Sequence, residues 1–301
     1  MAEPLQSREQ SSKSPLVTVA MPVYNAGTYL RLAVLSIVKQ SFTDWELLIV
    51  DDGSTDNALQ SISDINDVRI HISCDGKNKG LAARLNECID LARGKYLARM
   101  DQDDVSYPER FMRQLELLQK NPFLDLVATR TITIDAHNEA TGIFPGSLAH
   151  DEICSKPWLG FHFPHPTWLG RIKWFREHRY SIPGPYYCED QELLLRSYRE
   201  SRFATVDEIL FGYRVRGTIN WQKLLKTRWT VLHVQLRQFT SSNQWHFMLL
   251  SISVFAAKMT GDLLKMVSLG LFQNRRLRED DAVVLQWNRV LSDLAVESKE
   301  P

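Results

Sequence analysis

The stretch from Lys95 to Asp104, Lys-Tyr-Leu-Ala-Arg-Met-Asp-Gln-Asp-Asp, is an apolar run that ends abruptly in three carboxylates. The apolar part is typical of a buried strand, and the last residues of such a strand reach the edge of a sheet, where open α/β proteins bind ligands. Three crowded acids repel one another unless a cation lies between them. Carboxylate oxygens suit Mg²⁺ and Mn²⁺, often together with substrate phosphates. The alternative is a solvated acidic turn at the start of a helix.

Two further apolar runs also end in polar loops that contain glycine, and one of these loops is acidic. Val17–Met21 is followed by Pro-Val-Tyr-Asn-Ala-Gly, and Glu46–Val50 is followed by Asp-Asp-Gly-Ser-Thr-Asp. The sequence predicts that each of the three runs leads into a helix, at residues 29–40, 58–65 and 107–120. Alternation of strand and helix predicts a parallel sheet with its loops along one edge. Three polar loops that meet there are better explained by a shared ligand than by three independent solvated turns.

Four motifs carry a resemblance to a known family. They are Val-Ala-Met-Pro-Val-Tyr-Asn at 19–25, Val-Asp-Asp-Gly-Ser-Thr-Asp at 50–56, Asn-Lys-Gly-Leu-Ala-Ala-Arg-Leu-Asn at 78–86 and Met-Asp-Gln-Asp-Asp at 100–104. In this order and spacing they resemble glycosyltransferase family 2, whose members have the GT-A fold. Four ordered motifs are far more specific than one short pattern. The match is close from about residue 16 to 122 and looser to about 217.

The resemblance implies a pocket for the base and ribose of a nucleoside-diphosphate sugar. It makes Asp52 the acid that recognises the base, with Asp51 and the segment containing Pro22, Tyr24 and Asn25 in the same pocket. Tyr24 can stack on a base through its flat ring, and a core position for this ring is the alternative. Asp51 can also cap the turn that comes after it.

Cations and N–H groups for a diphosphate are expected in two places. Lys79, Gly80 and Arg84 stand where a loop enters a predicted helix, and a helix N-terminus with nearby cations attracts phosphate. Solvation of the lysines in this loop is the alternative. The looser, later part of the match offers three more candidates for contact with the diphosphate: His165, Arg214 and Arg216.

The acidic cluster has two roles under the resemblance. Asp101, Gln102 and Asp103 would contact the donor, and Asp101, Asp103 and Asp104 would hold Mn²⁺ or Mg²⁺. A metal that bridges the α- and β-phosphates neutralises the charge that develops on the leaving nucleoside diphosphate. Spacing alone does not decide which of the three acids touches the ion.

The acceptor half contains a candidate catalytic base. Glu189 and Asp190 open a predicted helix whose buried face includes Leu193, Leu194 and Leu195. Two acids at a helix start have a structural explanation, because they complement the helix dipole. They also match the Glu-Asp motif of the family, in which the Asp takes the proton of the acceptor hydroxyl. The resemblance thus implies that Asp190 is the general base and Glu189 its orienting neighbour.

Composition bounds the remaining choices. With 36 basic and 36 acidic residues the chain lacks the basic excess of a nucleic-acid-binding protein. The four cysteines form no Cys-x-x-Cys pair, as expected for reduced thiols in the cytosol. The polar residues 1–14 predict a disordered lead-in rather than a signal peptide. A catalytic domain is expected at 15–217, with a nucleotide-sugar half to 125 and an acceptor half from 126, followed by a helical region at 218–301.

The helical region has two interpretations. Apolar residues recur at helical spacing from Trp221 to Phe239, and Phe247–Ala257 contains no charge. Because Lys258 and two later charges interrupt the apolar pattern, and a span needs about 20 apolar residues, we expect no transmembrane helix. The region would pack on the catalytic domain or on a second subunit of a homo-oligomer. Alternatively it would lie on a membrane, with Arg275, Arg276 and Arg278 against anionic lipid.

The expected function is that of an inverting, metal-dependent glycosyltransferase. It would move one sugar at a time from a nucleoside-diphosphate sugar to a saccharide or a lipid-linked saccharide during assembly of a bacterial surface polysaccharide such as O-antigen. The expected location is the cytoplasm, or peripherally the inner face of the membrane. Two alternatives are an aspartate-nucleophile phosphohydrolase, because Asp-Gln-Asp-Asp-Val resembles its Asp-x-Asp-x-Val motif, and a non-catalytic nucleotide-sugar-binding module. The first strand lacks the Gly-x-Gly-x-x-Gly of an NAD-dependent oxidoreductase.

Overall fold

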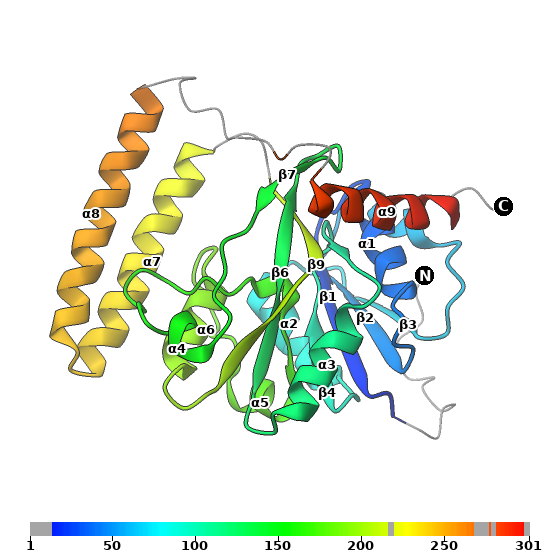
Figure 1. The fold of residues 1–301 in the computed structure, drawn as a ribbon, viewed down its shortest axis with the longest axis horizontal. Helices are drawn as coiled ribbons and strands as arrows, with labels where there is room; N and C mark the ends of the chain where they lie inside the picture. Colours follow the sequence, from blue (N-terminus) through cyan, green and yellow to red (C-terminus); the bar gives the residue numbers. More distant parts are fainter. Residues whose placement is uncertain (1–13, 216–219, 268–276, 278–280, 298–301) are drawn as a thin grey trace.

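The computed structural model describes residues 14–215, 220–267, 277 and 281–297. In this part of the chain a mixed sheet of nine strands forms the centre, and helices pack against it (Figure 1). The strands are β1 (Val17–Val23), β2 (Trp45–Asp51), β3 (Ile70–Cys74), β4 (Tyr96–Arg99), β5 (Val105–Ser106), β6 (Leu126–Ile134), β7 (Ala140–Ile143), β8 (Leu169–Arg171) and β9 (Phe203–Arg214). Their order is β3-β2-β1-β4-β8-β6-β9-β5, with β7 paired to β6.

Parallel pairing dominates the first half of the sheet. β1 pairs in parallel with β2 and β4, and β2 pairs in parallel with β3. β6 and β9 are also parallel, whereas β8 runs antiparallel to both β4 and β6. Every residue of β1 and β2 is buried, and strands covered on both faces are continuous apolar runs rather than alternating ones. The expected mostly parallel α/β sheet is therefore confirmed.

The register of these strands brings their loops together. Val23 at the end of β1 lies opposite Asp51 at the end of β2. Ala20 of β1 lies opposite Arg99 at the end of β4. The C-terminal ends of β1, β2 and β4 therefore meet at one edge, which is where open α/β sheets bind their ligands.

Of the three helices predicted in the donor half, those at 29–40 and 107–120 are present and the one at 58–65 is not an α-helix. The described helices are α1 (Tyr29–Val38), α2 (Leu81–Leu91), α3 (Arg110–Lys120), α4 (His150–Ile153), α5 (Ile172–Glu177), α6 (Glu189–Ser197), α7 (Trp221–Ser241), α8 (Trp245–Val267) and α9 (Ala282–Glu297), with 3₁₀ helices η2 (Ala58–Ile62) and η3 (His165–Thr167). The α-helix expected over residues 58–65 was wrong, because η2 replaces it. The segment is only five residues long, a length typical of 3₁₀ helices, and the hydroxyls of Ser61 and Ser63 donate to backbone carbonyls three residues earlier, at 2.6 and 2.9 Å.

α7 and α8 form a hairpin that stands to one side of the sheet (Figure 1). α7 begins at Trp221, as expected, and the side chain of Asn220 caps it by accepting a hydrogen bond from the Lys223 N–H at 2.9 Å. Gln235 attaches the helix to the catalytic body, because its amide donates to the carbonyls of Pro157 and Trp158 at 3.2 and 3.0 Å.

α9 returns to the catalytic body and packs against it (Figure 1). The Trp287 ring is fully buried, stacks on Tyr107 at a centroid distance of 6.0 Å, and donates through Nε1 to the Asn138 carbonyl at 2.7 Å. Gly212 of β9 makes room for this ring, since a Cβ there would lie 2.7 Å from it. α9 thus packs on the catalytic body, as the first interpretation of the helical region expects, and the α7–α8 hairpin stands to one side of the sheet. Contact of the hairpin with a membrane stays a prediction.

The argument from length and charge against a transmembrane helix does not hold, and whether the chain crosses a membrane stays a prediction. Among the described residues one segment, Trp245–Leu264 in α8, has the necessary length and composition. Two of the charges that were taken to interrupt it lie on the side of the helix that faces the protein. Lys258 donates to the Leu159 carbonyl at 3.2 Å, and Asp262 accepts from Arg228 at 3.1 Å. Length and composition alone do not distinguish a span from a helix that lies on a membrane surface.

Candidate active site

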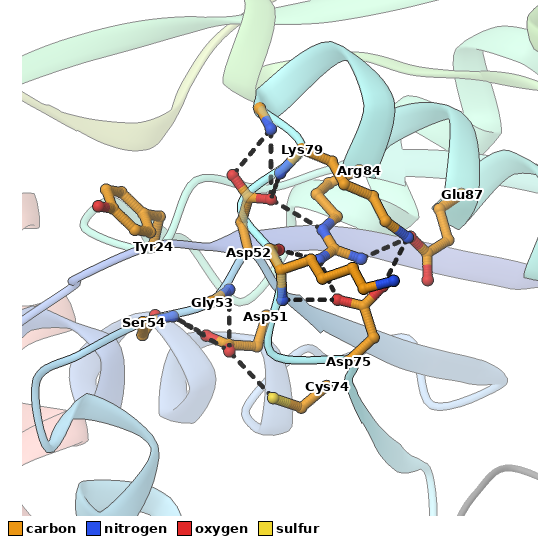
Figure 2. Close-up of polar contacts among 12 residues, drawn as sticks. Tyr24, Asp51, Asp52, Gly53, Ser54, Cys74, Asp75, Lys79, Arg84 and Glu87 are labelled. Carbon is orange, nitrogen blue, oxygen red and sulfur yellow. Dashed lines mark hydrogen bonds and ion pairs between the residues drawn. The ribbon is translucent and has the colours of Figure 1, made fainter.

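Asp52 is the centre of a network that joins the loop after β2 to the loop between β3 and α2 (Figure 2). Its nearly buried carboxylate accepts hydrogen bonds from the N–H groups of Lys79 and Gly80, at 2.6 and 3.0 Å, and from Arg84 Nε at 2.9 Å. The buried Arg84 guanidinium also contacts Asp75 and Glu87, at 2.6 and 2.7 Å. Although burial disfavours the charge of Arg84, these carboxylates raise its pKa. The network holds the Asp52 carboxylate in a single orientation.

This network bears on the phosphate contacts expected from the same loop. Every nitrogen of the Arg84 guanidinium donates to a carboxylate. The Lys79 ammonium is 42% exposed and lies 2.5 Å from Asp75. Arg84 therefore positions Asp52 in this structure, and contact of Lys79, Gly80 or Arg84 with a diphosphate stays a prediction.

Asp51 caps the turn at the end of β2. Its carboxylate accepts from the N–H groups of Gly53 and Ser54 at 3.2 Å, and Cys74 Sγ lies 3.2 Å away. Gly53 has φ of +74°, and a Cβ there would come within 3.0 Å of the Lys77 backbone. Only glycine fits such a turn without strain. The capping interpretation of Asp51 is confirmed, and its contact with a ligand stays a prediction.

The Tyr24 ring is 47% exposed, so the alternative of a core position was wrong. The ring stands apart from the ion pairs around Asp52 (Figure 2). Gln102 ties this loop to the acidic loop, because its amide accepts from the Tyr24 N–H at 2.6 Å and donates to the Tyr24 carbonyl at 3.0 Å. Asn25 accepts from the Thr55 N–H at 2.8 Å, which ties it to the second loop. The three loops therefore meet, and Pro22 lies buried beneath them in β1.

The acidic cluster brings three carboxylates together. Asp101, Asp103 and Asp104 each offer an oxygen, and these atoms lie within 4.8 Å of one another. Asp104 is buried: one of its oxygens accepts from the Arg214 N–H at 2.7 Å, and the other has no hydrogen-bond partner among the described residues. Burial and the charges of Asp101 and Asp103 raise the pKa of Asp104 well above its usual range. A buried carboxylate oxygen without a partner, beside two more carboxylates, fits a hard divalent cation.

Arg99 is a site residue that the sequence interpretation missed. Its guanidinium is 3% exposed, and Nη2 lies 2.5 Å from Asp101 Oδ1. Nε and Nη1 have no hydrogen-bond partner in the part of the chain that the structure describes. Burial opposes the charge, but Asp101 and the neighbouring acids raise the pKa of Arg99. The sequence feature that could have identified Arg99 is a charged residue at the end of an otherwise apolar strand.

Asp190 and Glu189 form the first turn of α6, as expected. Burial raises the pKa of both carboxyl groups, and the charge of Arg99 opposes this shift in each. Gln191, which the sequence interpretation also missed, donates to Asp190 Oδ2 at 3.1 Å. The same amide holds the Phe161 backbone, accepting from its N–H at 2.8 Å and donating to its carbonyl at 3.2 Å. Gln191 therefore fixes the Asp190 carboxylate relative to the loop before η3.

The three later diphosphate candidates have different surroundings. His165 lies 2.7 Å from the Tyr180 hydroxyl and packs edge-on against Trp168, and burial, with the charge of Arg99, lowers its pKa well below the usual range. Arg214 donates to the backbone carbonyls of Asp103 and Asp135 and to the Asn138 side chain. Arg216 lies outside the described residues, as do residues 1–13 and the cluster of Arg275, Arg276 and Arg278. Contact of these groups with a diphosphate stays a prediction.

Three curated proteins illustrate the relatives of this chain. Putative glycosyltransferase EpsE of Bacillus subtilis is 34% identical over 210 residues, covering 67% of this chain and 74% of that protein. An uncharacterized glycosyltransferase of Haemophilus influenzae is 30% identical over 214 residues, covering 67% of this chain and 66% of its own, just under two thirds. The Escherichia coli protein WfgD, described as a UDP-Glc:alpha-D-GlcNAc-diphosphoundecaprenol beta-1,3-glucosyltransferase, is 33% identical over 106 residues, covering 35% and 42%.

The fold is shared with a solved glycosyltransferase, and the family is established by a sequence model. The mannosyltransferase PcManGT of Pyrobaculum calidifontis, solved with GDP-Man and Mn²⁺, aligns with a TM-score of 0.58 at 13% identity, covering 96% of this chain and 89% of that one. The model of Glycosyl transferase family 2 matches residues 18–179, more than half of the chain, and includes all four motifs. The chain therefore belongs to glycosyltransferase family 2.

Proposed function

We propose that the chain transfers one sugar from a nucleoside-diphosphate sugar to a saccharide hydroxyl, with inversion at the anomeric carbon and with Asp190 as the general base. One observation carries this proposal. Arg99 contacts Asp101 of the acidic cluster, and its charge also opposes the rise in the pKa of Glu189 and Asp190, so one buried arginine acts electrostatically on acids of both the donor and the acceptor half. Family membership supports this activity over a phosphohydrolase.

Different residues would bind the base, hold the metal and remove the proton in a single-displacement reaction. Tyr24 offers an exposed ring for the base, and the Asp52 network offers a fixed acceptor for its N–H groups. Asp101, Asp103 and Asp104 would hold the divalent cation, which supplies Lewis-acid stabilisation of the leaving nucleoside diphosphate. Asp190 takes the proton of the acceptor hydroxyl as its oxygen bonds to the anomeric carbon, while the bond from that carbon to the β-phosphate oxygen breaks. One attack opposite the leaving group inverts the configuration.

The donor site is tested by nucleotide binding. We expect uridine, guanosine or thymidine diphosphate to raise the melting temperature of the protein in the presence of Mn²⁺, because a ligand that binds only the folded state stabilises it. In Asp103→Ala and Asp104→Ala the Mn²⁺-dependent rise should disappear, since the cluster loses an anionic ligand. Undiminished Mn²⁺-supported binding of the nucleotide in both variants would refute the metal assignment.

The general base is tested by Asp190→Asn. The amide keeps the shape of the carboxylate and removes its basicity, so donor binding should remain near normal. Transfer, measured as released nucleoside diphosphate and glycosylated acceptor, should fall about 10²–10⁴-fold, the usual contribution of a positioned base. Wild-type turnover in this variant would show that another group takes the proton.

We further propose a lipid-linked saccharide as acceptor and the cytoplasmic face of a membrane as the place of action. The apolar, largely exposed α8 supports this proposal. So does the similarity to WfgD, whose described acceptor carries a diphosphoundecaprenol. The setting that fits these two observations is assembly of a bacterial surface polysaccharide.

A further inference from the structure

A cavity of about 210 Å³ lies between α7, α8 and the loop before η3. It is smaller than the roughly 300–1,000 Å³ of sites that enclose a whole drug-sized ligand, so it suits a segment of a larger molecule. Most of its wall is apolar. The apolar lining residues are Trp158, Leu159, Phe161, Leu224, Val231, Leu232, Val254 and Phe255.

Two cations stand in this apolar wall. Arg228 of α7 and Lys258 of α8 both line the cavity, and none of its described lining residues is acidic. Asp262 pairs with Arg228 at 3.1 Å, and the Lys258 ammonium donates to the Leu159 carbonyl at 3.2 Å. The Asp262 carboxylate offsets one of the two charges and the Asp190 carboxylate lies behind Gln191, so the charged groups that line the apolar wall itself are the cations Arg228 and Lys258. Such a combination complements a phosphate attached to a hydrocarbon chain.

The cavity reaches the proposed catalytic base through one side chain. Gln191 lines the cavity, and its amide donates to the Asp190 carboxylate at 3.1 Å. Phe161 lines the cavity too, and its backbone holds the same amide. A molecule seated in the cavity is therefore separated by the Gln191 side chain from Asp190, the residue that would take the proton of the acceptor hydroxyl.

The hairpin that forms the cavity carries an apolar outer surface. Trp245, Leu249, Ile252 and Leu263 recur at helical spacing along one side of α8, and between 42% and 60% of each is exposed. α8 is the outermost helix of the molecule on this side (Figure 1). The cavity is thus walled by a helix whose other side suits hydrocarbon.

We propose that this cavity binds the hydrocarbon chain and adjacent phosphate of a polyprenyl-diphosphate-linked acceptor. The apolar wall receives the first isoprene carbons, Arg228 and Lys258 meet the diphosphate, and the attached sugar extends past Gln191 to Asp190. This inference rests on the proposed function, since it names how the acceptor of that reaction is held.

Farnesyl diphosphate serves as a soluble probe for full-length protein in calorimetry. We expect it to bind at least tenfold more tightly than inorganic diphosphate or farnesol, because each of these offers half of the recognised chemistry. Val231→Trp fills the cavity and should weaken farnesyl diphosphate binding at least tenfold, whereas Leu249→Trp on the outer side of α8 should not. Lys258→Gln, which does not fill the cavity, should also weaken it if the phosphate is recognised.

Three results would overturn the inference. The first is that both tryptophan variants bind farnesyl diphosphate equally well and Lys258→Gln binds it as tightly as the wild type. The second is that farnesol binds as tightly as farnesyl diphosphate. The third is that monomeric dihexanoyl-phosphatidylglycerol binds as tightly as farnesyl diphosphate, which would assign the cavity to membrane lipid. Mn²⁺-dependent nucleotide binding is measured in parallel on each variant. If the nucleotide binds but the cavity variants bind farnesyl diphosphate like the wild type, the cavity proposal fails and the proposed function remains. If the wild type does not bind the nucleotide with Mn²⁺, the proposed function itself is refuted.

Discussion

Asp190, the proposed general base, has an unfavourable effect on folding when it is ionised. Burial raises its pKa, and the hydrogen bond from Gln191 and the charge of Arg99 offset only part of that shift. A carboxylate with a raised pKa is a stronger base than an exposed one, which suits proton removal from a hydroxyl. The same shift means that the ionised group is less stable in the folded protein than in the unfolded chain.

We therefore expect Asp190→Asn to raise the melting temperature at pH 7 to 8. At a pH above the raised pKa both the folded and the unfolded wild type are ionised, so the folded state bears the full penalty of the buried charge. As the pH falls through the raised pKa toward about 4, the ordinary value for Asp, the folded wild type takes up a proton and the difference should vanish. Thermal unfolding at several pH values measures this. A variant less stable than wild type at pH 7 would contradict the assigned burial penalty.

At the scale of the element, α9 is part of the hydrophobic core of the catalytic body. Trp287 fills the space above Gly212 of β9 and bonds to Asn138, 149 residues earlier in the chain. The rest of its buried face includes Val284, Val290 and Leu294. A chain cut before α7 would therefore lose part of its core together with the hairpin.

Trp287→Ala should lower the free energy of unfolding by about 3–5 kcal/mol, since it removes a fully buried ring and leaves a cavity. Leu285→Ala is the matched control on the same helix, because Leu285 is 49% exposed and should change stability little. Urea unfolding of the two variants measures the difference. Equal effects would show that α9 does not dock as described.

α8 presents the opposite case, an element whose apolar side is exposed within the part of the chain that the structure describes. Its charged residues Lys258 and Asp262 turn toward Leu159 and Arg228, so the outer side is free of both. An amphipathic helix of this kind binds a membrane interface through its apolar side. The hairpin is the element that would bring the whole molecule to its acceptor.

For the whole molecule we expect co-sedimentation with phosphatidylglycerol vesicles. The triple variant Leu249→Gln, Ile252→Gln, Leu263→Gln should remain in the supernatant, because its outer side no longer favours hydrocarbon. The control is Val68→Gln with Phe123→Gln, which removes two exposed apolar residues, 93% and 88% exposed, from the catalytic body. Equal partitioning of wild type and the triple variant would exclude α8 as the membrane contact.

Local pattern was sufficient for most of the donor half. Continuous apolar runs that end in polar loops predicted β1, β2 and β4, and parallel strands bring such ends to one edge whatever the details of packing. The first turn of α6 and the start of α7 were also readable, because capping and helical periodicity are local properties. The 3₁₀ helix η2 was not, since the apolar pattern of a five-residue segment does not distinguish a 3₁₀ helix from an α-helix.

Tertiary structure alone decided which side chains meet and which surfaces stay open. Arg99 and Asp190 are 91 positions apart, and nothing in either segment announces that the charge of one acts on the other. The same apolar periodicity describes α9, which is packed, and α8, which is exposed, because periodicity records that a face is apolar and not what covers it. The sequence by itself therefore determined the family, the sheet and the acidic loops. The arginine among the acids, the amide beside the base and the cavity in the hairpin depend on contacts between distant residues, which only the folded chain creates.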